Sequence, residues 1–231
     1  MNTPLAATSP PYGELGMLEG MAARPDALIF DLDGTLWDTC ATCADTWNRV
    51  LGRLGIAYRP INAADVRSVA GQPHTEGVRR VFVGLSEDQI RSISEATQIE
   101  DNLAIARSGG GLYPGVREHV PRLRALLPLM IVSNCQRGYI EIFLSTSGLA
   151  AHFSDFECWG NTGQTKSANL RALIERNRLR SPWFIGDTEA DFEAARDNGL
   201  RFIHASYGFG EVFACEHRIT RFTELLGDVA A

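Results

Sequence analysis

The chain has 231 residues, of which 45% are hydrophobic and 22% charged, with a formal net charge of −6. This composition is that of a globular protein with one large domain, or one domain and a smaller insert. The acidic balance argues against a nucleic-acid or anionic-membrane partner, and no apolar stretch approaches the roughly 20 residues that cross a bilayer, so we expect a soluble protein.

Cysteine usage indicates the compartment. The five cysteines are odd in number and scattered along the chain, which favours a reducing compartment, and we expect the protein to be cytoplasmic. Cys40 and Cys43 have the Cys-x-x-Cys spacing of redox and zinc sites, but neither a second such pair nor a nearby histidine pair accompanies them. We interpret them as two small residues on one helix.

Residues 1–24 are expected to form a flexible N-terminal extension. They contain several prolines and no positively charged region followed by an apolar core, so they do not resemble a secretory signal. Their role and the true start site stay open.

The first predicted element is a buried strand that ends at two acids. The apolar run Ala27-Leu28-Ile29-Phe30 is followed by Asp31-Leu32-Asp33-Gly34-Thr35. A short apolar run bounded by glycine is typical of a buried parallel strand, and Gly34 allows the chain to turn sharply.

The next 74 residues, 38–111, are expected to be mainly helical, without a convincing strand. Helical spacing predicts a helix over 38–54, and Asn62 begins a short helix to residue 69. After a break at Gly71-Gln72-Pro73-His74, a helical run follows. Ser86 and Gln89 have capping-box spacing and begin a further helix, which ends at residues 109–111.

Strands and helices alternate in the rest of the chain. Tyr113-Pro114-Gly115 precedes a helix, and the later strands are expected at 127–132, 155–159, 183–186 and 202–205, with helices at 137–147, from 163 to 177, up to 198 and at 222–226. This alternation predicts an α/β fold, a doubly wound parallel sheet with helices on both faces.

The first two strands of this sheet are separated by far more residues than a crossover needs. The excess is the helical stretch, so we expect an inserted α-helical cap domain at 38–111. Residues 25–37 and 112–231 then form the α/β core.

Polar residues follow three of the predicted strands, at the edge where ligands bind in doubly wound sheets. These residues, together with a lysine that begins a helix beside them, are Asp31, Asp33, Ser133, Asn134, Lys166, Asp187 and Asp191. Clustered carboxylates repel one another unless a cation or proton compensates them, and hard oxygen ligands suit Mg²⁺. A metal, a lysine and a reactive carboxylate suit phosphoryl transfer.

Four motifs occur in order: Asp31-Leu32-Asp33-Gly34-Thr35, Ser133-Asn134, Lys166, and Gly186-Asp187-Thr188-Glu189-Ala190-Asp191. With them the chain resembles the haloacid dehalogenase superfamily, in particular its helical-cap phosphatases of the phosphoglycolate phosphatase and β-phosphoglucomutase group. The resemblance implies a Rossmann-like core and a Mg²⁺-dependent phosphatase. It would hydrolyse a small phosphorylated metabolite through an aspartyl phosphate.

The resemblance also implies residue roles. Asp31 would be the nucleophile, and Asp33 the general acid toward the leaving alcohol and then the base toward water. Mg²⁺ would be held by Asp31, the backbone carbonyl of Asp33 and Asp187, with Asp191 in the outer shell. Phosphate-binding groups would be Ser133, the amide of Asn134, Lys166 and Thr35, whereas Gln72, His74 and also Arg67 are candidates for substrate contacts from the cap.

Departures from related patterns narrow the reaction. Dehalogenases of this superfamily lack the second carboxylate, so the presence of Asp33 disfavours cleavage of a carbon–halogen bond. Phosphonate hydrolases of this superfamily use a lysine of the cap, but Lys166 is the only lysine of this chain and lies outside the expected cap, which disfavours phosphonate hydrolysis. A phosphomutase of the β-phosphoglucomutase type stays an alternative, although Cys43 stands near the place of its usual cap histidine. A catalytically inactive binding member is the third possibility. A monomer or a homodimer is expected, and the identity of the substrate stays open.

Overall fold

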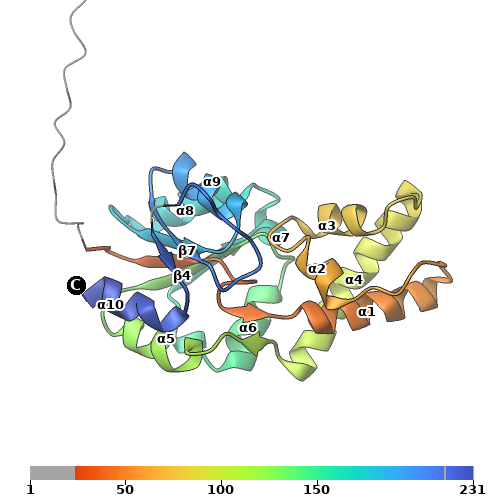
Figure 1. Cartoon of the computed structure of the whole chain (residues 1–231), viewed down its shortest axis with the longest axis horizontal. Coiled ribbons are helices and arrows are strands. Elements are labelled where there is room, and N and C mark those ends of the chain that lie inside the picture. Colours follow the sequence, from red (N-terminus) through yellow and green to blue (C-terminus); the bar gives the residue numbers. More distant parts are fainter. Residues whose placement is uncertain (1–23, 216, 231) are drawn as a thin grey trace, which may run out of the picture.

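The computed structural model describes residues 24–215 and 217–230 (Figure 1). The predicted extension therefore lies outside the described residues, except for Arg24. The main sheet has six parallel strands: β1 Leu28–Phe30, β4 Leu129–Ser133, β5 Asp155–Cys158, β6 Trp183–Gly186, β7 Arg201–Ala205 and β8 Arg218–Ile219. The predicted doubly wound α/β fold is confirmed.

The strand order β5-β4-β1-β6-β7-β8 places β1 in the middle of the sheet. Its Leu28 is in register with Leu129 on one side and with Trp183 on the other. The chain first builds the sheet outward from β1 through β4 and β5, and then returns to add β6, β7 and β8 on the opposite side. The order reverses between β1 and β6, and ligand sites of doubly wound sheets lie at such a reversal.

Helices cover both faces of the sheet. On one face lie α8, Lys166–Asn177, and α9, Glu189–Asp197; on the other lie α5, Val116–Arg124, α6, Tyr139–Ser147, and α10, Leu225–Ala230 (Figure 1). Successive strand side chains point to opposite faces. Accordingly, alternate residues of the central strands belong to different apolar clusters, Leu28 and Phe30 to one and Ile29 to the other.

Four of the helices that come between β1 and β4 in the chain lie together at one end of the molecule (Figure 1). They are α1 Cys40–Leu54, α2 Ala63–Arg67, α3 His74–Val81 and α4 Glu87–Ser108, and we call them the helical unit. The capping box predicted at Ser86 is confirmed, because its side chain accepts a hydrogen bond from the Gln89 amide and the Gln89 side chain accepts one from the Ser86 amide.

The expectation of no strand within residues 38–111 was wrong. The chain enters and leaves the helical unit through a two-stranded antiparallel ladder of β2, Trp37–Asp38, and β3, Gly111–Leu112. Each strand has two residues, which is too short for an alternating pattern, and only their pairing defines them. The ladder lies where residues 38 and 111 were expected to bound a cap domain, and that division of the chain stays a proposal.

Other differences concern element ends. The strand expected at 127–132 begins and ends later, as β4, and the one expected to include Trp159 ends at Cys158, where the four-residue α7, Trp159–Thr162, begins. The final helix starts as a 3-10 turn, η2 Phe222–Glu224, before α10. Strand β8 and the 3-10 turn η1, Ala150–His152, were not predicted, because such short pieces depend on their neighbours.

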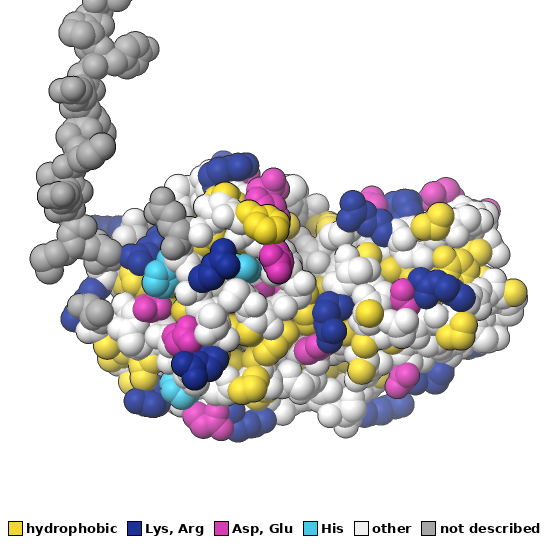
Figure 2. Space-filling model, in the orientation of Figure 1, with side chains coloured by type: hydrophobic (Ala, Val, Ile, Leu, Met, Phe, Trp, Pro, Cys, Tyr) yellow, Lys and Arg dark blue, Asp and Glu magenta, His cyan; other side chains and the backbone are white. Residues whose placement is uncertain are grey.

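The outer surface is of mixed character. In Figure 2, acidic and basic side chains are interspersed on the visible face rather than gathered into a patch of one sign. Among the helices that the structure describes, none combines the length and apolar character that a bilayer-spanning helix needs.

Candidate active site

The carboxyl ends of β1 and β6 bring the predicted acids together. Asp31 directly follows β1, and Asp187 directly follows the neighbouring β6. Asp191 is on the first turns of α9, and Lys166 is the first residue of α8. These four side chains are at most 4% exposed, although they are far apart in the sequence.

Lys166 joins two of these carboxylates. Its ammonium Nζ donates a hydrogen bond of 2.6 Å to Asp31 Oδ1 and another of 2.6 Å to Asp191 Oδ1. Burial by itself would lower the pKa of Lys166, but the two carboxylates outweigh that effect and raise the pKa above its ordinary value. The lysine therefore stays charged and holds both acids in place.

Asp191 is saturated with donors from the protein. Besides Lys166, its carboxylate accepts hydrogen bonds from the hydroxyl and the amide of Thr188, at 2.6 and 3.0 Å, and from the amide of Asp187, at 3.3 Å. Thr188 and Asp191 form the capping box of α9. A carboxylate with this many partners positions the helix and the lysine.

Asp187 is held from two sides. Its Oδ1 accepts a hydrogen bond of 3.1 Å from the Thr35 hydroxyl, and its Oδ2 accepts one of 2.8 Å from the Phe209 amide. Burial, followed by the negative charge of Asp191, raises the pKa of Asp187 to about 7. The backbone approaches so closely that a Cβ on Gly34, which has a φ of +88°, would lie 2.1 Å from Asp187 Oδ2.

Asp31 differs from its neighbours in having an open oxygen. Lys166 binds Oδ1, but the buried Oδ2 has no hydrogen-bond partner among the described residues. Burial raises the pKa of Asp31 well above its usual range, because Lys166 offsets only part of that cost and Asp191 and Asp187 add to it.

The donor set fits a divalent cation. Asp31, Asp187 and Asp191 each offer an oxygen, and these atoms lie within 4.8 Å of one another. Three carboxylates against one ammonium leave two negative charges uncompensated in a buried site. A cation with a preference for hard oxygen ligands would neutralise these charges.

Asp33 is paired with a residue that the sequence did not point to. Its Oδ1 accepts a hydrogen bond of 2.7 Å from the Tyr139 hydroxyl at the start of α6. Burial raises the pKa of Asp33 from its usual 3.8 to about 6, although the Tyr139 hydrogen bond opposes this rise. A carboxyl with such a pKa exchanges a proton near neutral pH.

A cavity of about 90 Å³ lies between the sheet edge and the helical unit. The sheet side contributes Asp31, Asp33, Ser133, Asn134, Cys135, Gln136, Tyr139 and Phe209. The other side contributes Thr39, Cys40, Cys43, Trp47, Val66, Val69, Ala70, Gly71, Gln72, His74, Gly77 and Asp101. The predicted Gln72 and His74 therefore line the same cavity as Asp31 and Asp33.

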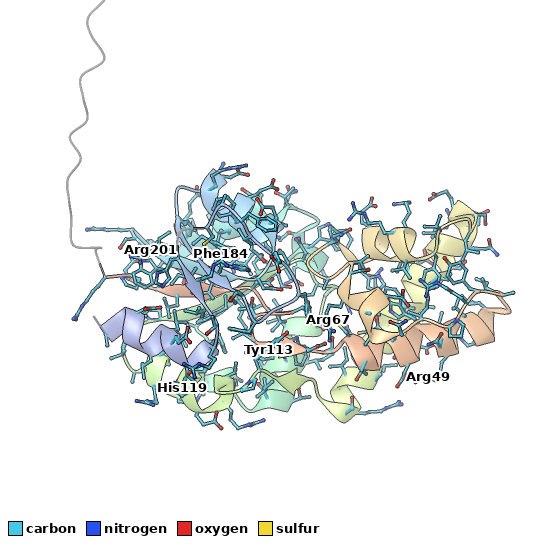
Figure 3. The ribbon with its side chains drawn as sticks, viewed as in Figure 1. Arg49, Arg67, Tyr113, His119, Phe184 and Arg201 are labelled. Atoms are coloured by element: carbon cyan, nitrogen blue, oxygen red, sulfur yellow. The ribbon has the colours of Figure 1, made fainter. Side chains whose placement is uncertain are left out.

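Other predicted residues are placed differently. Thr35 is fully buried with its hydroxyl on Asp187, and Ser133 lines the cavity. Asn134 joins the two sides of the cavity, because its Nδ2 donates a hydrogen bond of 2.8 Å to the Gly71 carbonyl. Arg67, the last residue of α2, pairs with Asp38 of β2 at 2.7 Å and is 45% exposed (Figure 3).

Cys40 and Cys43 both lie on α1, as their interpretation as two small residues on one helix requires. Both thiols are free and buried, and burial raises the pKa of each above the ordinary thiol value. A raised pKa makes a thiol a poor nucleophile at neutral pH.

Sequence reasoning missed the roles of Thr188, Tyr139 and Asp101. For Thr188 a signal was present, because it has the Thr-x-x-Asp spacing of a capping box with the predicted Asp191. Tyr139 and Asp101 belong to no motif. Only the packing of α6 and α4 brings them to the cavity.

Comparison with known proteins gives consistent matches. The family described as haloacid dehalogenase-like hydrolase matches residues 28–205. A phosphoglycolate phosphatase from Rhodobacter capsulatus is 31% identical over 189 residues, covering 79% of this chain and 85% of that protein. A phosphoglycolate phosphatase from Synechococcus elongatus is 31% identical over 188 residues, covering 80% of this chain and 85% of that protein.

The fold is also that of solved structures. A haloacid dehalogenase-like family hydrolase from Streptococcus pneumoniae superimposes with a TM-score of 0.77 at 21% identity, over 88% of this chain and 98% of that one.

Proposed function

Because the chain belongs to the haloacid dehalogenase-like hydrolases and is a phosphatase acting on a small phosphorylated substrate, we propose that it uses Mg²⁺ and an aspartyl phosphate. One observation carries this proposal. Asp31 has a buried open oxygen at the wall of the cavity, beside an acid whose pKa is about 6. A nucleophile and a proton donor are thus side by side.

Mg²⁺ would be held by Asp31, Asp187 and the backbone carbonyl of Asp33. Asp191 would remain in the outer shell, because Lys166, Thr188 and Asp187 already supply its hydrogen bonds. When bound, the ion would neutralise charge on the phosphoryl oxygens and on the nucleophile.

In the first step, Asp31 attacks the phosphorus atom, and the bond from phosphorus to the ester oxygen breaks. Asp33 gives its proton to that oxygen, so the alcohol leaves neutral. Lys166 holds Asp31 through Oδ1, which leaves Oδ2 for the attack. Ser133 and the amide of Asn134 would bind the phosphoryl oxygens from the end of β4.

In the second step, Asp33 acts in the reverse direction. Its carboxylate takes a proton from water, the water oxygen attacks phosphorus, and the acyl-phosphate bond to Asp31 breaks. Inorganic phosphate leaves, and both carboxyl groups return to their starting states. The Tyr139 hydroxyl keeps Asp33 turned toward the cavity in both steps.

The cavity of about 90 Å³ suits a small phosphate ester. The relatives are named for 2-phosphoglycolate, which makes this compound one member of the test panel. We place the reaction in the cytoplasm, because all five thiols are free, as in a reducing compartment.

Phosphate release from an aryl phosphate and a panel of small phosphate esters tests the proposal, with Mg²⁺ and with a chelator. We expect turnover with Mg²⁺ and little without it. Asp31→Asn should lower kcat by about 1000-fold or more, because the amide is not a nucleophile. The matched control Asp45→Asn alters an exposed residue of α1 and should leave kcat unchanged. Absence of turnover by the wild-type protein over the whole panel would reject the proposal.

A further inference from the structure

The helical unit contributes one buried acid to the cavity. Asp101 of α4 is 1% exposed and lines the cavity, and none of the proposed steps uses it. Its Oδ1 is buried and has no hydrogen-bond partner among the described residues. Leaving a buried carboxylate oxygen unpaired costs free energy, so an open oxygen at a cavity wall indicates a group that the cavity receives.

The other oxygen of Asp101 is held as an acceptor. Trp47 Nε1 donates a hydrogen bond of 3.0 Å to Asp101 Oδ2, and His74 Nε2 lies 3.6 Å from the same atom. An indole nitrogen can only donate, so this contact fixes Oδ2 as an acceptor.

The hydrogen bonds of His74 define which ring nitrogen carries the proton. The Thr97 hydroxyl donates to the Ile93 carbonyl at 2.8 Å, so toward His74 Nε2, at 3.3 Å, it can only accept. His74 Nε2 therefore carries a hydrogen and points it toward Thr97 and Asp101. Burial raises the pKa of Asp101, and the two N–H groups that face Oδ2 oppose that rise. The carboxylate form of Asp101 has an open acceptor at Oδ1.

The cavity offers little to a carboxylate on the substrate. None of the described residues that line it is a lysine or an arginine, and Lys166 is bound to Asp31 and Asp191. Arg67 is paired with Asp38 instead of lining the cavity. A second carboxylate brought close to Asp101 in this buried space would be repelled.

We propose that Asp101 is a specificity-determining residue whose Oδ1 accepts a hydrogen bond from a hydroxyl or ammonium group on the non-reacting part of the substrate. This hydrogen bond selects phosphate esters of polyols and amino alcohols over esters that end in a carboxylate. The proposal rests on the proposed phosphatase function. Trp47 and His74 are positioning residues that orient Asp101. The acid lies on the helical unit, whereas the reacting groups lie on the sheet.

The test measures kcat/KM with Mg²⁺ for glycerol 3-phosphate, phosphoethanolamine and 2-phosphoglycolate, which carry a hydroxyl, an ammonium and a carboxylate group. The quantity to compare is the ratio of kcat/KM for either of the first two esters to that for 2-phosphoglycolate. We expect a ratio above one for the wild-type protein. Asp101→Asn should lower it about 10-fold or more, because the charged acceptor is lost and repulsion of the carboxylate ends.

The ratio separates substrate recognition from a general loss of activity. A misplaced helix lowers kcat/KM for both esters and leaves the ratio of the two kcat/KM values unchanged. Asp88→Asn is the matched control, since this aspartate is on the same helix and 83% exposed. Its ratio should equal that of the wild-type protein. The wild-type ratio also needs no variant, so it tests the proposal even where Asp101→Asn does not fold.

Preference of the wild-type protein for 2-phosphoglycolate would overturn the proposal, as would a ratio that changes less than twofold in Asp101→Asn. Turnover of an aryl phosphate without turnover of any of the three esters would also overturn it, while the phosphatase function would stand. Absence of turnover of every ester, the aryl phosphate included, would instead reject the phosphatase function itself and the specificity with it.

Discussion

Two buried aspartates, one at the sheet edge and one on the helical unit, differ in their partners. Asp191, beside the sheet edge, accepts hydrogen bonds from Lys166, Thr188 and Asp187 on both oxygens. Asp101, on the helical unit, accepts one indole hydrogen bond and keeps its other oxygen open. Burial of an acid therefore does not by itself indicate function, since a carboxylate with all its hydrogen bonds filled organises structure, whereas one with an open oxygen is available to a ligand.

The same contrast separates the two walls. At the sheet edge, Asp31 and Asp191 both accept hydrogen bonds from Lys166, and the backbone at Gly34 packs closely against Asp187. The helical wall is largely apolar around Asp101 and His74. We therefore expect substitutions at the sheet edge to change stability and turnover together, and substitutions on the helical wall to change mainly which ester is preferred.

The largest expected effect on stability is that of Lys166→Met. It leaves two buried carboxylates without their counter-charge, which should lower the free energy of unfolding by about 3–5 kcal/mol. Urea denaturation in the presence of a chelator measures this loss.

Arg176→Met is the matched control for that loss. Arg176 also joins two carboxylates, Asp155 and Glu157, but it is 38% exposed, so its removal should cost no more than about 1 kcal/mol. Equal losses in the two variants would contradict the view that the sheet edge depends on a buried charge network.

Gly34→Ala tests the close packing of the sheet edge. The new Cβ would lie 2.1 Å from Asp187 Oδ2 at a φ of +88°, so strain and a steric clash should together cost about 3 kcal/mol. Gly148→Ala has a comparable φ of +75° with nothing within 4 Å, and should cost about 1 kcal/mol. Thermal or urea unfolding of both variants separates backbone strain from the clash. A difference near zero would show that Asp187 moves freely.

The smallest expected effect is the pH dependence contributed by Asp33. Burial raises its pKa in the folded protein from 3.8 to about 6, so the folded state binds this proton more tightly than the unfolded state does. The contribution of this proton to the stability of the folded protein is complete below pH 3.8 and is lost as pH rises toward 6.

Without metal, the wild-type protein should lose about 1–2 kcal/mol relative to Asp33→Asn over that pH window. Urea unfolding of both proteins between pH 4 and 7 measures the difference. A difference that stays constant with pH would mean that Asp33 titrates alike in both states.

Much of the sheet edge could be predicted from the sequence. The apolar run before Asp31 and the run before Asp187 each end at an acid, and parallel strands end at one edge. The strand at Trp183–Gly186 was predicted with both ends correct, because this buried strand is a continuous apolar run in the sequence. Lys166 was found through its place in the order of motifs.

The partners of these residues could not be predicted in the same way. Tyr139 donates to Asp33 across 106 positions of sequence, and Trp47 donates to Asp101 across 54, although neither Tyr139 nor Asp101 belongs to a motif. The ladder of Trp37–Asp38 and Gly111–Leu112 is equally non-local. Such pairs arise when helices dock, and no local pattern encodes docking.

The α/β alternation, the inserted helices and the candidate catalytic acids could be inferred from the sequence alone, because periodicity and strand ends depend on neighbouring residues. Which acids have all their hydrogen bonds filled, and which carboxylate oxygens stay open, became evident only from the three-dimensional structure. That outcome depends on hydrogen-bond partners brought together from distant segments. The chemistry could thus be inferred from motifs, whereas the recognition of the substrate depends on how the helical unit packs over them.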